Sequence, residues 1–426
     1  MRSHRSAALW FCLVSACSTT NTGNPVAPDG VKLARSSLKR DTAPDVSAED
    51  QARLGEGNRD FAFSLYQAIR DRGGNLFYSP YSISVALAMT YAGAEGVTEN
   101  EMAAAMHFDL PEPTLHAAFN AADLSLQGRA DERARKGGNG FTLNVTNAMF
   151  MALGLQPKAD YLDTLAVSYG AGLFLADFAA DPEGQRLAIN DWTGQRTRGR
   201  IPELLPARSI ASDVAFVLVN AIYFKASWLE PFDRDRTQPA VFHAPAGDVS
   251  VSTMHGGGTW YMRGDDYQAL ELPYVSDAVR MLIVLPDEGQ FEAVEARMNR
   301  ELFDQTRAAL GGYAVTVQLP RFTFEAGFEL KDALTELGMV SAFSAADFSG
   351  IAGLPGDIFI DQVYHKAFVA VDEEGTEAAA ATAVVGRQLS APPPAEFIAD
   401  RPFLFFIHDE PAGQILFAGR LTQPDD

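Results

Sequence analysis

Apolar residues recur along this chain with two different spacings, and each spacing predicts a different kind of element. Residues 59–69 carry apolar side chains three or four positions apart, which predicts an amphipathic helix, and residues 82–92 form a second apolar helix. Residues 216–226 are an almost continuous apolar run rich in β-branched and aromatic side chains. Such a run is typical of a strand that is buried on both faces.

The second half of the chain is richer in strand patterns. Residues 279–285 form another apolar run, and residues 314–324 alternate as a half-buried strand does. Residues 292–310 predict a charged amphipathic helix, whereas 403–408 and 415–421 flank a turn and predict a hairpin. Because helices dominate the first half and strands the second, the pattern predicts an α+β fold rather than a repeating βαβ one.

The N-terminus has the pattern of an export signal. Basic residues Arg2, His4 and Arg5 precede an apolar stretch, residues 7–14, that is too short to span a bilayer. The stretch ends in Val-Ser-Ala-Cys, with the cysteine at position 17, and resembles the lipobox of bacterial lipoproteins. The alternative is an ordinary secretory signal in which Cys17 is coincidental.

This resemblance leads to a three-part organisation. We expect a signal peptide over residues 1–16, a lipidated flexible tether over 17–50 and a single folded domain over 51–426. The tether region is rich in Ser, Thr, Asn, Pro, Gly and charge and has no hydrophobic periodicity. The protein is then exported, and is either anchored to a membrane, on an outer-membrane, periplasmic or cell-surface face, or secreted.

Composition narrows the possible partners. The net charge is -21, and an acidic surface repels phosphate backbones, so nucleic acid is not an expected partner. The two cysteines are Cys12 and Cys17, which leaves the predicted domain without a disulfide, a zinc-type cysteine cluster or a cysteine nucleophile.

Motifs for catalysis are missing from the sequence. We find no G-x-S-x-G, H-E-x-x-H, P-loop or G-x-G-x-x-G pattern. Residues 255–258 read His-Gly-Gly-Gly, like an esterase oxyanion loop, but without a nucleophile elbow they predict a turn. His365 lies in an apolar, strand-like stretch and is expected to be a buried core residue. We therefore expect no enzyme activity, no cofactor and no metal site.

The most unusual segment is residues 372–394, DEEGTEAAAATAVVGRQLSAPPP. It begins with an acidic cluster, continues with small side chains and ends in three prolines. A low-complexity surface loop is the simplest interpretation. However, residues 375–391 contain no proline, so each backbone amide in that span can donate a hydrogen bond to a neighbouring strand. Alternate positions from 376 to 384 are Thr, Ala, Ala, Thr and Val, which are small enough to fit beneath packed helices. The segment is predicted to change from a loop into a strand.

Together these motifs resemble those of the serpin family over about residues 50–426. The matching motifs are 75–83 (NLFYSPYSI), 216–228 (FVLVNAIYFKASW), 328–332 (FELKD), 337–339 (LGM) with Phe343, 365–367 (HKA), 372–381 (DEEGTEAAAA), 400–405 (DRPFLF) and 413–421 (GQILFAGRL). The resemblance implies helices packed around a large central sheet and two smaller sheets, with an exposed reactive-centre loop near the C-terminus.

The resemblance also implies a mechanism, in which a serine protease cuts the loop and the cut loop inserts into the central sheet. The scissile bond is expected at Leu389-Ser390, with Arg387-Gln388 as the alternative. The hinge and inserting residues would be Gly375, Thr376, Glu377, Ala378, Ala379, Ala380, Ala381, Thr382 and Ala383, with Thr376 the first side chain to enter the sheet. Ser79, Ser82, Asn220 and His365 match the polar cluster that must open, and Trp228 matches the site where the loop enters.

The expected function is inhibition of serine proteases by a monomer that forms a covalent complex with its target. Leucine at the bond favours chymotrypsin-, elastase- or subtilisin-like targets. The alternative is a non-inhibitory serpin that acts as a carrier or binding module. The alanine-rich hinge argues against this alternative, because non-inhibitory members often carry bulky or charged residues there.

Overall fold

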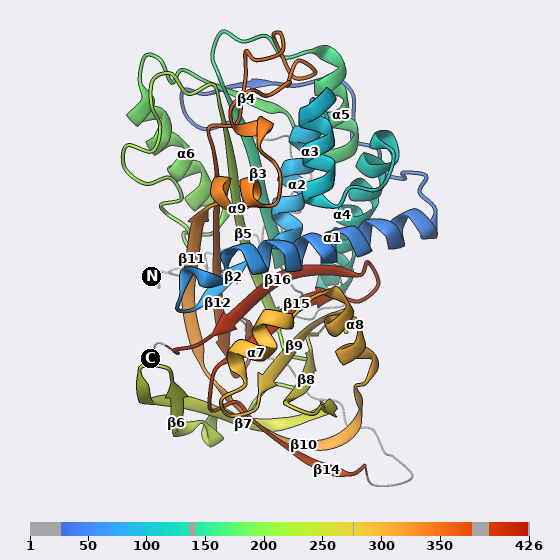
Figure 1. Ribbon diagram of the computed structural model, residues 1–426, viewed down its shortest axis with the longest axis vertical. Helices are drawn as coiled ribbons and strands as arrows, with labels where there is room; N and C mark the ends of the chain where they lie inside the picture. The colour runs from blue at the N-terminus through green and yellow to red at the C-terminus, as the bar shows by residue number, and fades with distance from the viewer. Residues whose placement is uncertain (1–26, 136–141, 276, 377–391, 425–426) are drawn as a thin grey trace, which may run out of the picture.

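Helices cover two β-sheets in the computed structural model, which describes residues 27–135, 142–275, 277–376 and 392–424 (Figure 1). Most of the helices lie in the upper half of the view, and the second sheet fills most of the lower half together with short helices. Within these residues the fold is the α+β arrangement that the sequence predicts.

The first sheet holds the predicted central strand. Its strand order is β1-β4-β3-β5-β13-β12-β11, and β5 is buried almost throughout its length. The strands are β1 (Lys32–Ala34), β4 (Leu173–Ala176), β3 (Thr142–Ala152), β5 (Phe216–Ser227), β13 (Gly375–Thr376), β12 (Gln362–Asp372) and β11 (Phe322–Glu329). The apolar run at 216–226 is therefore a strand buried between layers, as predicted.

The second sheet joins the two smaller sheets that were expected. The 17-residue strand β7 pairs with β6 and β10 along one part and with β8 along another. The order is β14-β10-β7-β8-β9-β15-β16-β2, with β6 beside β7. The strands are β14 (Pro394–Ile398), β10 (Gly311–Pro320), β7 (Gly247–Arg263), β8 (Tyr267–Pro273), β9 (Val279–Pro286), β15 (Phe403–Asp409), β16 (Gln414–Leu421), β2 (Leu76–Tyr78) and β6 (Gln238–Ala244).

Two predicted elements are each divided in the structure. The single strand expected over 314–324 is the end of β10 and the start of β11, which belong to different sheets. The chain changes sheet at Arg321, the one residue between β10 and β11. The single helix expected over 292–310 is two helices, because Asn299 interrupts it and its side chain caps the second.

Nine α-helices are assigned in the described residues, and local signals explain several of their starts. The side chain of Ser47 caps α1, and Ser79 caps α2 directly before Pro80. The helices are α1 (Ala48–Ile69), α2 (Pro80–Tyr91), α3 (Gly96–Met106), α4 (Glu112–Arg135), α5 (Ala159–Tyr169), α6 (Pro182–Arg196), α7 (Phe291–Arg297), α8 (Arg300–Ala308) and α9 (Lys331–Glu336).

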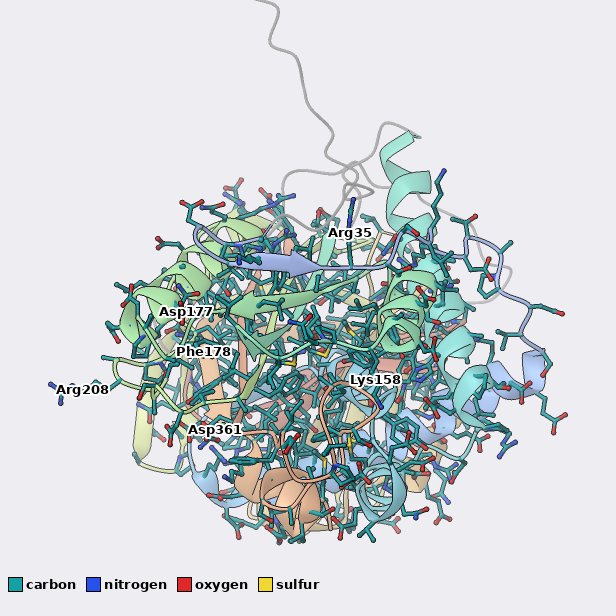
Figure 2. The ribbon with its side chains drawn as sticks, turned by 90° about the horizontal axis from the view of Figure 1, so that it is seen from above. Arg35, Lys158, Asp177, Phe178, Arg208 and Asp361 are labelled. Carbon is teal, nitrogen blue, oxygen red and sulfur yellow. The ribbon has the colours of Figure 1, made fainter. Side chains whose placement is uncertain are left out.

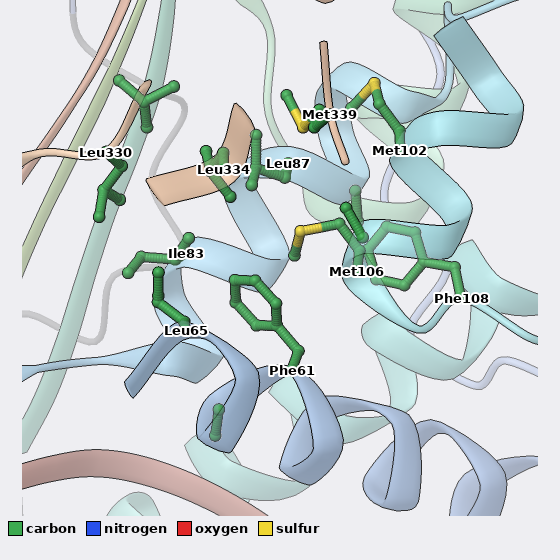
Figure 3. Close-up of a cluster of buried hydrophobic side chains, with 14 of the residues drawn as sticks. Phe61, Leu65, Ile83, Leu87, Met102, Met106, Phe108, Leu330, Leu334 and Met339 are labelled. Atoms are coloured by element: carbon green, nitrogen blue, oxygen red, sulfur yellow. The ribbon is translucent and has the colours of Figure 1, made fainter. Parts of the chain in front are cut away.

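The helical core lies where α1, α2, α3 and α9 meet (Figure 3). Phe61 and Leu65 of α1 and Leu87 of α2 are fully buried there, together with Met106 of α3 and Leu334 of α9. These positions follow the helical spacing in the sequence, so burial of the apolar faces fixes the helices against one another.

The N-terminal segment differs from the expected tether. Residues 27–50 pack on the domain instead of forming a free linker. Strand β1 pairs antiparallel with β4, and Val31 is buried. Arg40 forms an ion pair of 2.6 Å with Asp123, and its Nε donates to Asn120 over 2.8 Å. Figure 2 shows β1 lying across the edge of the sheet. The sequence did not predict β1, because three strand residues carry too weak a periodic signal. Residues 17–26 lie outside the described part of the chain.

Candidate functional site: the hinge between strands β5 and β12

The seam between β5 and β12 is the part of the sheet that must open if a further strand is to enter. The two strands run parallel and pair directly from Val217 and Gln362 to Tyr223 and Phe368. Beyond Phe368 they separate, and the short strand β13 lies between them. The seam is therefore closed along most of its length and already divided at one end.

Strand β13 consists of the first two hinge residues. Gly375 pairs with Ser227 of β5 and Asp372 of β12, and Thr376 pairs with Ala226 and Val371, antiparallel in both cases. The sequence predicted that Thr376 is the first side chain to enter the sheet. In the structure it is already between the strands, with 1% of its surface exposed.

Gly375 occupies a position that a larger residue does not fit. Its φ is 150°, and an added Cβ would approach the Cα of Ser227 to 2.6 Å and the N of Trp228 to 2.9 Å. Glycine is therefore required here by both backbone conformation and close contact with β5.

The acidic turn before Gly375 is held by backbone donors that follow β5. The N–H of Trp228 donates to the carbonyl of Glu374, and the N–H of Phe232 donates to that of Glu373, each over 2.8 Å. The hydroxyl of Thr237 donates to the Glu373 carboxylate over 2.7 Å, and Arg234 pairs with Glu374 at 2.6 Å. The acidic cluster at 373–374 therefore anchors the base of the hinge.

Trp228 lies beneath this turn, fully buried. Its indole N–H donates to the carbonyl of Asp372 over 3.0 Å, and its ring stacks on Tyr274 at 4.5 Å between centroids. The Tyr274 hydroxyl lies 2.8 Å from that of Thr376, and burial raises the pKa of Tyr274, so the phenol stays neutral. Sequence reasoning found Trp228 and missed Tyr274, which follows a strand with no distinguishing signal.

A row of polar side chains crosses the sheet at Asn220, six residues before the hinge contact at Ala226 along β5. Asn147 of β3, Asn220 of β5 and His365 of β12 are register partners on three adjacent strands. The amide of Asn220 bonds to the Asn147 oxygen, and the Asn220 oxygen lies 2.5 Å from Nδ1 of His365. Asn147 was missed, although an amide inside the apolar stretch of β3 is a usable signal.

His365 is neutral and has one defined tautomer. Burial lowers the pKa of His365 to about 3. Its Nε2 accepts a hydrogen bond from the N–H of Ser79 over 3.2 Å, so Nδ1 carries the proton and donates to Asn220. The interpretation of His365 as a hydrogen-bonded core histidine, rather than a base or ligand, agrees with this geometry.

The N-terminal end of helix α2 contributes two serines, its cap Ser79 and Ser82, to the polar cluster. The hydroxyl of Ser79 donates to the carbonyl of Leu416 over 2.6 Å, and Asn220 donates to the Ser82 hydroxyl over 2.7 Å. The structure thus brings Ser79, Ser82, Asn220 and His365 together, with Trp228 at the hinge.

The segment between α6 and β5 covers the outer face of the seam. The Arg198 guanidinium lies 5.6 Å from the ring centre of Tyr223, and that of Arg200 lies 5.1 Å from Phe368. Tyr223 and Phe368 are direct partners across the seam. The covering segment therefore contacts both strands and must shift when they separate.

The remaining predicted residues do not enter this geometry. Glu377, Ala378–Ala383, Arg387, Gln388, Leu389, Ser390 and Cys17 lie outside the described residues. Among the described residues no group of His, Cys, Asp and Glu is suited to hold a metal ion, and no helix is long and apolar enough to cross a membrane. Residues 255–258 are not the predicted turn, because they lie within β7 and pair with β10.

Relatives and solved structures resemble most of this chain. The family model "Serpin (serine protease inhibitor)" matches residues 56–424. A serpin-like protein of Thermococcus kodakarensis is 38% identical over 370 residues, covering 86% of this chain and 84% of the relative. The leukocyte elastase inhibitor of Bos taurus is 38% identical over 385 residues, covering 87% and 99%.

Solved structures share the fold. The native state of tengpin, a thermophilic serpin, superposes with a TM-score of 0.80 at 24% identity, covering 92% of this chain and 100% of that one. Uncleaved ovalbumin has a TM-score of 0.77 at 28% identity, covering 87% and 100%. With these matches and the architecture above, the chain belongs to the serpin family.

Proposed function

We propose that this protein inhibits serine proteases as a suicide substrate whose cleaved loop inserts between β5 and β12. The observation that carries the proposal is the placement of Gly375 and Thr376, which already form hydrogen-bonded pairs with both strands. A loop that starts inside the seam needs only to continue along it, and each further residue adds ladder bonds to both neighbours.

The register of β13 defines where each loop residue would go. Thr376 lies opposite Ala226, so every step forward along the loop is one step back along β5. Continued in this register, Val385 meets Val217 and Gly386 meets Phe216, the first residue of β5. Insertion to Gly386 spans the whole of β5, roughly 40 Å, and carries the bond at Leu389 past the far end of the sheet.

The same register brings Thr382 to the polar row. Six residues beyond Thr376, it reaches Asn220 on one side and His365 on the other. These two side chains bond to each other while the seam is closed. When the strands part, that bond must break, and the Thr382 hydroxyl, which can both donate and accept, is suited to replace it.

The alternation of side chains fits this path. Thr376 faces the buried side, toward Tyr274, so positions 378, 380, 382 and 384 would face the same way. These are Ala, Ala, Thr and Val. Small side chains at the inward positions can enter a packed interior without large displacement of the core.

Leucine at the proposed reactive bond favours a protease with an apolar specificity pocket. A denaturing gel after mixing with chymotrypsin and with subtilisin tests the proposal. We expect a covalent band heavier than either protein. Cleavage without such a band would instead support a non-inhibitory serpin.

We also propose export with a lipid on Cys17, based on the basic start, the short apolar stretch and the Val-Ser-Ala-Cys sequence. Metabolic labelling with a radioactive fatty acid tests it. Wild type should carry the label in the membrane fraction, and Cys17→Ser should carry none. Equal labelling of both would exclude lipidation at Cys17.

A further inference from the structure

A cavity of about 230 Å³ lies beside the residues that hold the hinge. It is formed by the segment 228–232, by residues 257–260 of β7, and by the residues at the end of β8 and the start of β9. We propose that it binds a small organic cation with an apolar body. This site goes beyond the inhibitory function and does not depend on it.

The walls of the cavity are apolar and partly exposed. Trp260 has 41% of its surface exposed and Leu229 has 39%, although both are large apolar side chains. Phe232 and Leu272 complete the inner wall and are nearly buried. Exposed apolar side chains beside a concave, partly buried surface are typical of a ligand site.

Two glycines of β7, Gly256 and Gly258, allow the inner wall of the cavity to pack closely against the strand. A Cβ added at Gly257 would have one neighbour within 4 Å, the carbonyl oxygen of Val315 at 3.7 Å. At Gly256 and Gly258 an added Cβ would instead come within 2.6 Å of Phe232 and 3.0 Å of Leu270. Gly256 and Gly258 are therefore explained by close packing against the inner wall of the cavity, whereas Gly257 faces the opposite, exposed side of the strand.

The charges at the rim favour a cation. Arg280 is the positive group of the lining, and it pairs at 2.9 Å with Glu271, a buried carboxylate that Arg307 also contacts at 3.5 Å. Asp277 also contacts Arg280, at 3.3 Å, and is largely exposed. Glu230 is exposed and has no ion-pair partner among the residues that the structure describes. The rim therefore has surplus negative charge, and the exposed face of Trp260 adds an attraction for cations.

The size of the cavity limits the ligand. Sites for drug-sized molecules have volumes of roughly 300–1,000 Å³, so this cavity fits a single aromatic ring with a short alkylammonium chain. The ring would lie against Leu229 and Phe232, with the ammonium group near Glu230.

Such a ligand would contact the segment that anchors the hinge. Trp228 and Phe232 line the cavity, and their backbone N–H groups donate to Glu374 and Glu373. A ligand that packs against their side chains restrains this segment. We therefore expect the exchange of these two amide hydrogens to slow when the ligand binds.

Binding can be measured by calorimetry on the intact protein, with phenethylammonium as the probe. We expect it to bind more tightly than neutral 2-phenylethanol, and 3-phenylpropionate to bind least. Equal affinity for the three probes, or binding to none of them, would overturn the proposal. Because no protease is used, either result leaves the inhibitory function untouched.

Two variants test the location. Trp260→Ala removes a large apolar wall of the cavity and should weaken phenethylammonium binding at least about tenfold, the equivalent of 1.4 kcal/mol. Glu230→Gln should weaken it about two- to fivefold, whereas Glu49→Gln, an exposed control on α1, should not change it. Unchanged binding in both cavity variants would overturn the site. If Trp260→Ala does not fold, Leu229→Ala replaces it, with the same expected direction. Hydrogen exchange at Trp228 and Phe232 that does not slow at saturating probe would overturn the link to the hinge.

Discussion

The hydroxyl oxygens of Thr376 and Tyr274 lie 2.8 Å apart inside the protein, so the first part of the reactive loop is already fastened to the core. Tyr274 in turn stacks on Trp228, whose indole N–H bonds to the carbonyl of Asp372. The hinge is therefore held by the same residues past which the rest of the loop would move. The predictions that follow rest on this arrangement.

Thr376→Arg should convert the protein from an inhibitor into a substrate. Position 376 is already buried between β5 and β12, so an unpaired arginine there costs several kcal/mol, displaces the start of the loop from the seam and prevents insertion from continuing. Titration of active chymotrypsin against the variant should show cleavage of the loop with little trapped enzyme. Thr376→Val is the matched control of similar size and should retain most trapping. Full trapping by Thr376→Arg would mean that the loop does not enter at this position.

Thr382→Val should weaken the inserted state more than the intact protein. Without the hydroxyl, the separated His365 and Asn220 lose a partner, and an unsatisfied buried polar group costs about 1–3 kcal/mol. The melting temperature of the cleaved variant should fall relative to cleaved wild type. Ala381→Ser changes the opposite face and serves as the control. An unchanged melting temperature for cleaved Thr382→Val would contradict the proposed register.

Leu389→Arg should shift inhibition from chymotrypsin-like toward trypsin-like proteases, because the residue before the bond fills the specificity pocket. Mass spectrometry of the C-terminal fragment, separated under denaturing conditions, identifies the cleaved bond directly. A wild-type fragment that starts at Ser390 agrees with the proposed bond. One that starts at Gln388 would place the reactive bond at Arg387 instead.

The free energy of unfolding should decrease as the pH is lowered from 6.5 to 5, and His365 should contribute part of this decrease. The pKa of this histidine is lowered to about 3 in the folded state and is about 6.5 when unfolded. Below pH 6.5 the unfolded state therefore binds a proton that the folded state does not, and stability decreases as the pH falls, with a limiting slope of about 1.4 kcal/mol per pH unit.

Urea unfolding of wild type and His365→Gln across this range isolates the effect of His365. Burial also lowers the pKa of His408, so only the difference between the two proteins is informative. The variant should be less stable at pH 7 but should lose less stability on acidification. Parallel pH profiles for the two proteins would show that His365 does not titrate differently on folding.

The central strand and the hinge were predictable for different reasons. The continuous apolar run at 216–226 has one good interpretation, a strand between two layers, and β5 confirms it. Small side chains without proline indicated a loop that can become a strand, and the resemblance to the serpins assigned the hinge to Gly375 and Thr376. In both cases a physical requirement of the fold acts on many consecutive residues and leaves a pattern in the sequence.

Features that depend on a single contact were not predictable. Tyr274 matters because the fold brings it between Trp228 and Thr376, which are far away in sequence. Strand β1 is three residues long and is defined mainly by its pairing with β4. The division of residues 292–310 into two helices rests on one capping residue, Asn299, inside an otherwise helical pattern. Tertiary contacts decide such cases, and local periodicity does not record them.

The most direct test is to sever the chain within residues 377–391 with a protease that is not trapped and to compare the thermal unfolding of the cut and intact proteins. If the freed strand occupies the gap between β5 and β12, the cut protein gains a full set of ladder bonds and should melt well above the intact one. If the two forms melt at the same temperature, or the cut form melts lower, the loop has stayed outside and the account is wrong.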